Sequence, residues 1–357
     1  MTITIHGLEP ETKAVKTFKG FSYLLQHMLF SRINVRGQLG HHVTLLVDGI
    51  EGVTKKPDAK ELEFVEAEYL WIKVPAEWVE SRTGNFDNIV WTVDHSSPIG
   101  MIFPWKMFSE FTAFYMEQSR PEIESKLLNK RWDLVMVDAL FTPFGILIGL
   151  LTNSTMASVH TTAVSNADGF RRPMPNAWSY YPTLFMPTPQ YDHRKFFDRF
   201  NSFCTDLSQL FVYNMLVDSI LYWHHSKHHK DISSYTLDHR SEILLVGFPT
   251  TLDYERPRAR DMTPFVGSCK QRKTTVEIED AEIRKMVEDP ASKGTIVIAF
   301  GHMVTWKMAP EIVKKSFVEA LNMLKDYRVI WQYSEDVESL KVGNHVKCMP
   351  WIPQVKL

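Results

Sequence analysis

The stretch "KGTIVIAFGHMVTWKMAPE", Lys293 to Glu311, predicts a strand, a glycine turn and a helix start in direct succession. The continuous apolar run that ends at Phe300 is typical of a buried parallel strand. Gly301 then permits a close backbone approach, and Pro310 suits the first turn of a helix. Such a turn can bind phosphate through backbone N–H groups, although it also occurs as ordinary α/β topology. The stretch therefore predicts an α/β fold. It contains neither GxGxxG nor GxxxxGK[ST], which disfavours a dinucleotide or P-loop site.

The rest of the chain shows the same alternation of short apolar runs and longer amphipathic stretches. Helical patterns cover Tyr23–Gln38, Met107–Asn129 and Ala309–Leu324. The alternation predicts parallel sheets with crossover helices, in which ligands gather where the strands end. Six apolar runs are predicted strands: His41–Val47, Trp132–Asp138, Met156–Thr162, Glu242–Phe248, Gly294–Phe300 and Arg328–Tyr333.

One domain boundary is visible in the composition. From Leu252 the chain becomes polar and proline-rich, which predicts an interdomain linker over 252–292 with a short helix near Asp280–Glu288. The predicted domains are therefore an N-terminal one over 1–251 and a C-terminal one over 293–357. The second has room for one βαβ unit and the start of another strand, so we expect it to be incomplete.

Composition excludes several function classes. The 357 residues are 44% hydrophobic and 23% charged, which is typical of a globular protein. A net charge of -2 gives no basic field for a phosphate backbone, so we expect no nucleic-acid partner. Cys204, Cys269 and Cys348 are odd in number and far apart, which indicates neither a disulfide framework nor a zinc site.

Two segments raise the question of a membrane. The apolar stretch Leu134–Leu151 contains Asp138 and Pro143, which favour a buried strand followed by a helix over a membrane span. The helix predicted over Leu210–Lys230 ends in "HHSKHH", where His224 and His228 lie one turn apart without a carboxylate or thiolate to complete a metal site. We predict a solvated helix end, although the apolar face of this helix could instead dock on a membrane surface. The N-terminus lacks the pattern of a secretory signal.

The last residues extend the candidate site after Phe300. In "HVKCMPWIPQ", a strand near Val346–Met349 would deliver Trp351 and Gln354 to the same sheet edge as Gly301. An indole can stack on a nucleobase, and an amide can hydrogen-bond to a base or a ribose. Together with the glycine turn, these residues predict a site of nucleotide size.

Several short motifs of the sequence resemble those of a known family. The words "VIAFGHMV", "WIPQ", "LDYERP" and "FVGSC" resemble the donor half of an animal, nematode-like UDP-glucuronosyltransferase of the UDP-glycosyltransferase family. The words "GHHVTLLV", "WDLVMVDAL", "SEILLVGF" and "YRVIWQY" extend the resemblance over most of the chain in the family's order. The resemblance implies the GT-B fold, with two Rossmann-like domains facing each other across a cleft.

The resemblance also implies a function. The family transfers glucuronate or another hexose from a UDP-sugar to a small lipophilic hydroxylated acceptor. The N-terminal domain would bind the acceptor and the C-terminal domain the UDP-sugar, with no metal and no further cofactor. The implied location is the lumenal side of the endoplasmic reticulum membrane, and a homo- or hetero-oligomer with related transferases is a further implied partner.

The chemistry requires a base that removes the acceptor proton, and a histidine oriented by a buried carboxylate suits this task. Asp138 matches the family's orienting aspartate, with a helix N-cap or a turn ligand as the structural alternative. His27 is the nearest candidate for the base. It lies closer to Gly40 than the family pattern places it, so a partly buried helix histidine is the alternative. Donor binding is assigned by resemblance to Gly301, His302, Trp351 and Gln354.

Two departures from the family pattern weaken the donor assignment. The family's Ser-x-Gly-Ser turn is Ala299, Phe300, Gly301 and His302 here, so both hydroxyl groups are missing. The chain also ends four residues into the donor signature, without the family's membrane tail. These departures predict a fragment, a truncated isoform or an incomplete gene model with little activity. The alternative function is a non-catalytic module that binds acceptors or pairs with relatives. A nicotinamide oxidoreductase would need a glycine fingerprint after the first strand, which is missing.

Overall fold

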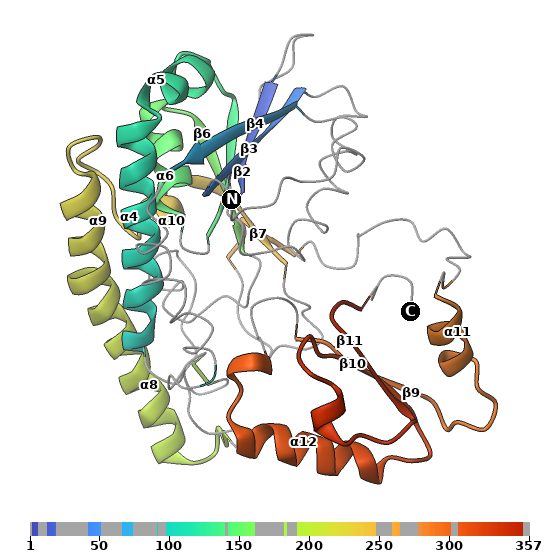
Figure 1. Cartoon of the computed structure of the whole chain (residues 1–357). Helices are drawn as coiled ribbons and strands as arrows, with labels where there is room; N and C mark the ends of the chain where they lie inside the picture. Colours follow the sequence, from blue (N-terminus) through green and yellow to red (C-terminus); the bar gives the residue numbers. More distant parts are fainter. Residues whose placement is uncertain are drawn as a thin grey trace. The chain divides into compact units, whose positions relative to one another are not determined.

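The computed structural model divides the chain into two compact units (Figure 1). Unit 1 comprises Met1–Pro75 and Asp94–Cys269, and unit 2 comprises Ala76–Val93 and Lys270–Leu357. The structure describes residues 2–5, 13–18, 42–50, 66–73, 91, 98–139, 142–160, 182–183, 191–247, 259–264, 278, 280–300 and 306–352. The boundaries predicted at 251 and 292 stay a prediction, because residues 248–258 and 265–277 lie outside these ranges.

Unit 1 is built on one large sheet. Parallel pairing joins its strands in the order β4-β3-β2-β5-β6-β7-β8, while β1 (Thr2–Ile5) runs antiparallel to β3 and β5. The parallel sheet confirms the expected topology, and the antiparallel β1 is an addition that the alternation of strands and helices did not indicate. The parallel strands are β2 (Lys13–Phe18), β3 (His42–Ile50), β4 (Glu66–Ile72), β5 (Leu134–Asp138), β6 (Thr155–His160), β7 (Ser241–Val246) and β8 (Met262–Pro264).

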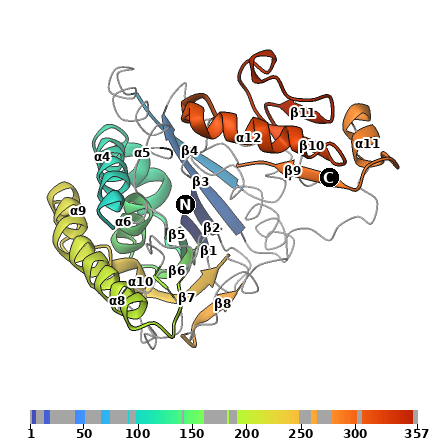
Figure 2. The same ribbon diagram turned by 90° about the horizontal axis from the view of Figure 1, so that it is seen from below.

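The described helices of unit 1 cover one face of this sheet (Figures 1 and 2). Met107, Phe111 and Tyr115 recur at helical spacing and bury the inner face of α4. The prediction over 107–129 therefore divides in three, because α4 ends at Gln118 and two shorter helices follow. The elements of this layer are η2 (Pro98–Met101), α4 (Ile102–Gln118), α5 (Arg120–Ile123), η3 (Glu124–Leu128), α6 (Pro143–Leu151), α8 (Phe196–Phe211), η4 (Val212–Val217), α9 (Asp218–His225) and α10 (Thr236–Arg240).

The apolar stretch Leu134–Leu151 folds as predicted, into a strand and a helix. Strand β5 ends at Asp138, and α6 begins at Pro143 after a short turn. Helix α6 is too short to span a bilayer and is buried over nearly its whole length. Among the described residues, no helix is both long enough and apolar enough to cross a membrane.

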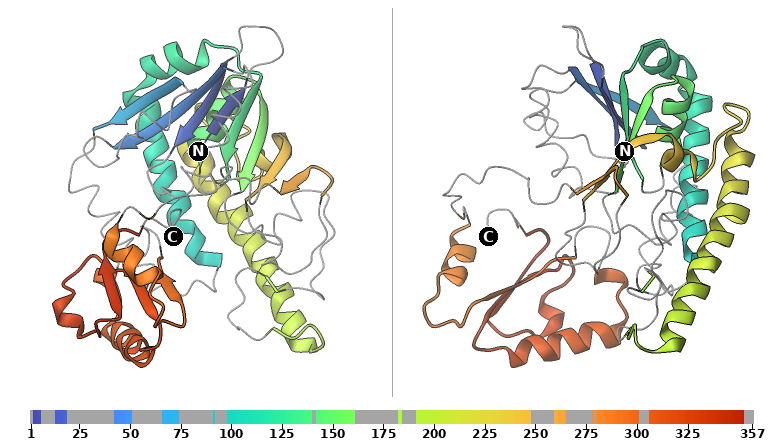
Figure 3. Two further views of the ribbon diagram at one scale, coloured as in Figure 1. Left: turned by 90° about the vertical axis from the view of Figure 1, so that its right-hand side faces the viewer. Right: turned by 180° about the vertical axis from the view of Figure 1, so that it is seen from behind.

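Unit 2 contains a three-stranded parallel sheet in the order β11-β10-β9 (Figure 3). Side chains alternate along β10, so Val329 and Trp331 pack against α12 while Ile330 packs against α11. Helix α11 matches the short helix predicted near 280–288, and Asp280 caps it by accepting hydrogen bonds from two backbone N–H groups. The elements are α11 (Ala281–Val287), β9 (Thr295–Ile298), η6 (Trp306–Met308), α12 (Glu311–Met323), β10 (Arg328–Gln332), η7 (Glu338–Leu340) and β11 (Val346–Met349).

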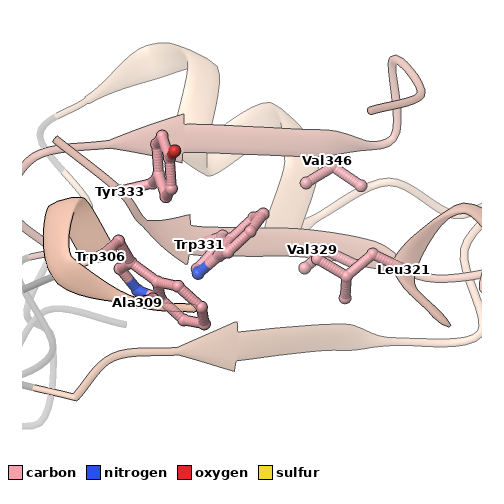
Figure 4. Packing of buried hydrophobic residues seen from close by; sticks show 7 residues of the cluster. All are labelled: Trp306, Ala309, Leu321, Val329, Trp331, Tyr333 and Val346. Carbon is pink, nitrogen blue, oxygen red and sulfur yellow. The ribbon is translucent and has the colours of Figure 1, made fainter. Parts of the chain in front are cut away.

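Aromatic side chains fill the α12 face of this sheet (Figure 4). Trp306, Trp331 and Tyr333 point toward one another there. The rings of Trp306 and Trp331 meet edge to face with centroids 4.8 Å apart. Trp91 packs against the same cluster, 5.4 Å from Trp306, although it lies some two hundred residues earlier in the chain. This contact gives a physical reason why Ala76–Val93 belongs to unit 2.

Candidate functional site

The carboxyl ends of β9, β10 and β11 form one edge of the unit 2 sheet. Ile298, Trp331 and Cys348 lie level across the three strands. Residues that follow β9 and β11 therefore emerge at the same edge, separated by the width of one strand, about 10 Å. This is the edge at which ligands of parallel α/β sheets bind.

Trp351 lies at this edge on a fixed backbone. The Tyr333 N–H donates to the Met349 carbonyl over 2.8 Å, which holds the end of β11 against β10. Ile352 is buried and packs with Ile283 and Ile330 on the α11 face. Because its neighbour is anchored in this way, the half-exposed indole of Trp351 is held at the surface. The anchored segment supplies a flat aromatic group where the sequence predicted one.

Ala299 and Phe300 replace a polar turn with apolar packing. Ala299 packs against the same cluster as Ile352, so the segments after β9 and β11 meet at one group of apolar side chains. Phe300 points to the opposite face and stacks on Trp306, with centroids 5.5 Å apart and ring planes 28° apart. Phe300 is still 44% exposed, so it adds a second aromatic surface to this edge. No motif marked Phe300 as a site residue, although its place directly after a predicted strand was a usable signal.

Four predicted site residues lie outside the described residues: His27, Gly301, His302 and Gln354. Their assignments stay predictions. Of the predicted set, the structure describes Asp138 in unit 1 and Trp351 in unit 2.

The start of α12 differs from the predicted phosphate turn. Pro310 occupies the N-cap position, and η6 lies between it and Gly301. Glu311 is the first helical residue, and its pKa is lowered by a hydrogen bond and charge attraction from Lys314. A carboxylate at this helix end already interacts with the positive pole of the helix dipole. A phosphate bound near Gly301 would thus depend on the turn itself and not on the start of α12.

Asp138 is buried at the carboxyl end of β5. It pairs with Val159 of β6 in the parallel register, and the following Ala139 N–H donates to the Val159 carbonyl over 3.0 Å. Thr142 occupies the N-cap position of α6, so Asp138 is not the helix cap that the sequence left open as an alternative. A buried carboxylate at a strand's carboxyl end is suited to orienting a second side chain.

His160 is the described histidine closest to Asp138 along the sheet, and analysis of the sequence did not identify it. It is buried at the end of β6, and its Nε2 makes no hydrogen bond to the described residues. The Met156 side chain lies against Gly149 of α6, so alternation directs His160 to the same helix-covered face. Asp138 lies level with Val159 and therefore points to the opposite face. The two side chains consequently do not form a pair.

The histidines at the end of α9 do not form a metal site within the described part of the chain, where no group of three or more potential ligands occurs. Burial lowers the pKa of His224 and of His228, so both rings are held in the neutral form at neutral pH. His225 is completely buried between the helices. These side chains are partly packed rather than solvated, which differs from the predicted solvated helix end.

Comparisons with known proteins find relatives of the enzyme class that the sequence motifs resemble. No family model matches the sequence. Human UDP-glucuronosyltransferase 3A1 is 23% identical over 351 residues, which cover 96% of this chain and 63% of the relative. The Caenorhabditis elegans protein ugt-50, named for the same enzyme class, is 20% identical over 242 residues, or 66% of this chain and 45% of its own length. The chain thus spans less than two thirds of the length of these relatives.

Among solved structures, the calicheamicin glycosyltransferase CalG4 superposes with a TM-score of 0.51 at 13% identity, over 95% of this chain and 70% of that structure. This likeness shows the fold, and the two curated relatives show a similarity in sequence to UDP-glucuronosyltransferases. The chain is therefore similar to UDP-glucuronosyltransferases over most of its length, and it has the GT-B type of α/β fold.

Proposed function

We propose that this chain contributes to the transfer of a hexose, with glucuronate as the leading candidate, from a UDP-sugar to a small lipophilic hydroxylated acceptor. The observation that carries the proposal is the aromatic edge of unit 2, where the half-exposed Trp351 precedes Ile352, which packs in one cluster with Ala299 after β9. A uracil ring can stack on this indole, and the turn at Gly301 would lie next to the diphosphate. The preference for glucuronate rests on the names of the relatives given above, and the lipophilic acceptor rests on the resemblance of the sequence motifs.

The proposed reaction is an inverting displacement. A base removes the proton of the acceptor hydroxyl while the oxygen attacks the anomeric carbon, and the bond from that carbon to the UDP oxygen breaks with its electron pair on UDP. His27 is the proposed base, and Asp138 is proposed to orient it and to stabilise its protonated form. The buried position of Asp138 at a strand end supports this role. His160 is excluded as its partner, because it points to the other face of the sheet.

Calorimetric titration of UDP into the protein tests donor binding. We expect Trp351→Ala to weaken UDP binding by roughly 5-fold or more, because stacking of a base on an aromatic ring contributes about 1–3 kcal/mol. Ile312→Ala is the matched control, since Ile312 is also exposed and apolar in unit 2 but lies on α12. Equal UDP affinity in all three proteins would refute the role of Trp351.

A second candidate function is an acceptor-binding module without catalysis. It is favoured by Ala299, which stands at a hydroxyl-bearing position of the family's turn and packs in an apolar cluster, and by the neighbouring Phe300, which stacks on Trp306. Titration with a phenol panel, with and without UDP, separates the two functions. An acceptor affinity that is the same with and without UDP supports the binding module, whereas an acceptor affinity that changes when UDP is added supports the transferase.

We also propose, from the resemblance of the sequence motifs to the family, that the protein acts on the lumenal side of the endoplasmic reticulum and associates with related transferases. Protease protection of the tagged protein in intact microsomes tests the compartment. Digestion without detergent would contradict it. Co-purification with a tagged relative, compared with an unrelated lumenal protein, tests the association.

A further inference from the structure

The outermost helix of unit 1 exposes apolar side chains where a surface helix normally exposes polar ones. Elements α8, η4 and α9 run end to end along the outside of the helix layer (Figures 1 and 3). Six large apolar side chains follow one another along this helix at spacings of four or seven residues, and each is between 44% and 62% exposed. We name them the apolar stripe: Phe196, Phe200, Leu207, Phe211, Met215 and Tyr222.

The inner face of α8 is polar, whereas η4 and α9 bury the apolar side chains Val212, Val217 and Leu221. Ser202, Asp206 and Gln209 are almost completely buried, and the Ser202 hydroxyl accepts a hydrogen bond from the Thr183 N–H. Burying polar groups while exposing aromatic ones costs free energy in water unless the outer face is covered. The orientation of the helix therefore indicates a non-aqueous surrounding for the apolar stripe.

The apolar stripe is free of exposed charge over most of its length. Between Arg199 and Lys227 the only charged residues are Asp206, which is buried, and Asp218, which is partly buried and accepts a hydrogen bond from the Ser234 N–H. At an expected rise of about 1.5 Å per residue, this interval is roughly 40 Å long. Trp223, the most exposed of the large apolar side chains at 85%, lies beside its end.

Basic side chains flank both ends of the apolar stripe. Arg194 and Lys195 precede Phe196, and Lys227 and Lys230 follow Trp223, all of them exposed. Arg194 is paired with Asp192 and Lys227 with Glu117, and these exposed pairs are worth little in water. Lipid headgroups of negative charge complement such flanks, and aromatic side chains favour the boundary between headgroups and acyl chains.

A second copy of the chain fits these features less well. Two copies related by a two-fold axis would pack their stripes either parallel or antiparallel. In both arrangements, a basic end of one copy would face a basic end of the other, because both ends are basic. A lipid surface has no such conflict, and it can cover a single projecting helix without a complementary groove.

We infer that the α8–η4–α9 helix is an interfacial membrane contact, which lies in the plane of an anionic bilayer with the apolar stripe inserted among the headgroups. The contact does not cross the bilayer, and it is independent of the proposed transferase function, since it needs neither UDP-sugar nor acceptor.

Sedimentation with vesicles of phosphatidylcholine and phosphatidylserine in a 4:1 ratio tests the inference. The variant Phe200→Ser/Phe211→Ser/Tyr222→Ser should reduce the partition coefficient by about 10-fold or more, because burial of each aromatic ring contributes to binding. The matched control Ile312→Ser/Met323→Ser removes exposed apolar side chains from α12 in unit 2 and should bind within about twofold of the wild type. Circular dichroism melts verify that all proteins are folded.

Two results would overturn the inference: no sedimentation of the folded wild type, or equal binding of both variants. Analytical ultracentrifugation tests the alternative that a second copy of the chain covers the apolar stripe. A dimer that the stripe variant abolishes, without vesicle binding by the wild type, would assign the apolar stripe to a second copy.

A fluorescent label gives an independent readout. Cys204 is exposed on α8, whereas burial raises the pKa of the Cys348 thiol to about 11 and slows its labelling. An environment-sensitive dye on Cys204, in a Cys269→Ser/Cys348→Ser background, should shift to shorter wavelength on adding the same vesicles. The same dye on Ile312→Cys, in the fully cysteine-free background with Cys204→Ser, should not shift. A matching shift at both positions would contradict insertion of the stripe.

Discussion

Trp331 is the residue on which unit 2 packing depends most. Its side chain is fully buried and contacts the rings of Trp306, Phe317 and Tyr333. Its ring and the Trp306 ring pack edge to face, an arrangement that stabilises aromatic pairs beyond their burial. Trp331→Ala should therefore destabilise unit 2 by about 3–5 kcal/mol. Urea unfolding followed by near-ultraviolet circular dichroism measures this. Met323→Ala, at an 83% exposed position, should change stability by less than about 0.5 kcal/mol.

Asp280 gives unit 2 a measurable pH dependence. The pKa of Asp280 is lowered by hydrogen bonds that its carboxylate accepts from the Ile283 and Glu282 N–H groups. A lowered folded-state pKa means that the stabilisation is complete above the unfolded pKa of about 3.9 and is lost as the pH falls through the folded value. Asp280→Asn keeps a capping side chain that does not titrate. Its thermal stability should match the wild type at pH 7 and fall less steeply below pH 4. Parallel acid curves for the two proteins would contradict this.

At the scale of elements, helix α6 packs closely on strand β6 because Gly149 has no side chain. A Cβ at Gly149 would lie 2.7 Å from the sulfur and terminal methyl of Met156, which is buried and cannot swing into water. Gly149→Ala should therefore cost about 1–3 kcal/mol from overpacking, reduced by up to about 1 kcal/mol through better helix propensity. Chemical denaturation of the single variants and of Gly149→Ala/Met156→Ala measures the coupling. Additive effects in this cycle would contradict the proposed contact.

The predicted elements that the structure confirms are those with a strong local pattern of apolar residues. The six predicted strands appear, because short apolar β-branched runs favour extended backbone in a parallel sheet, although β7 and β9 are buried only in part. Other features depend on distant residues: β1 pairs antiparallel with β3 and β5, and the helix after Lys195 begins well before Leu210. A helix that directs its polar face inward carries the usual amphipathic period, so sequence alone did not reveal which face is exposed.

At the scale of the whole molecule, a destabilising substitution in the core of one unit should not reduce the stability of the other unit. The Trp306 cluster of unit 2 contains no residue of unit 1, since even Trp91 belongs to Ala76–Val93. Hydrogen–deuterium exchange should show lost protection in β10 but not in β5 for Trp331→Ala, and the reverse for Gly149→Ala. Faster exchange in both units from either substitution would show that the chain unfolds as one cooperative body.

The candidate site could be predicted in part. Trp351 was predicted from a short C-terminal motif, and the structure confirms that its segment follows strand β11 at the carboxyl edge of the sheet, while its role in binding stays a prediction. Asp138 was found from its place after an apolar run, and the structure adds that it is buried and is not a helix cap. The aromatic filling by Phe300 and Trp306 could not be predicted, because ring contacts across a helix and a sheet leave no pattern of their own in the sequence.

The sequence by itself determined the α/β class and the parallel strands and indicated the likeness to UDP-glycosyltransferases, because periodicity and short motifs are local properties of the chain. Tertiary structure alone decided that Trp91 joins unit 2, that His160 and Asp138 lie on opposite faces, and that α8 exposes its apolar side. Each of these depends on which surfaces meet when segments far apart in the chain pack together. That choice is made by the burial of whole faces, which no single segment encodes.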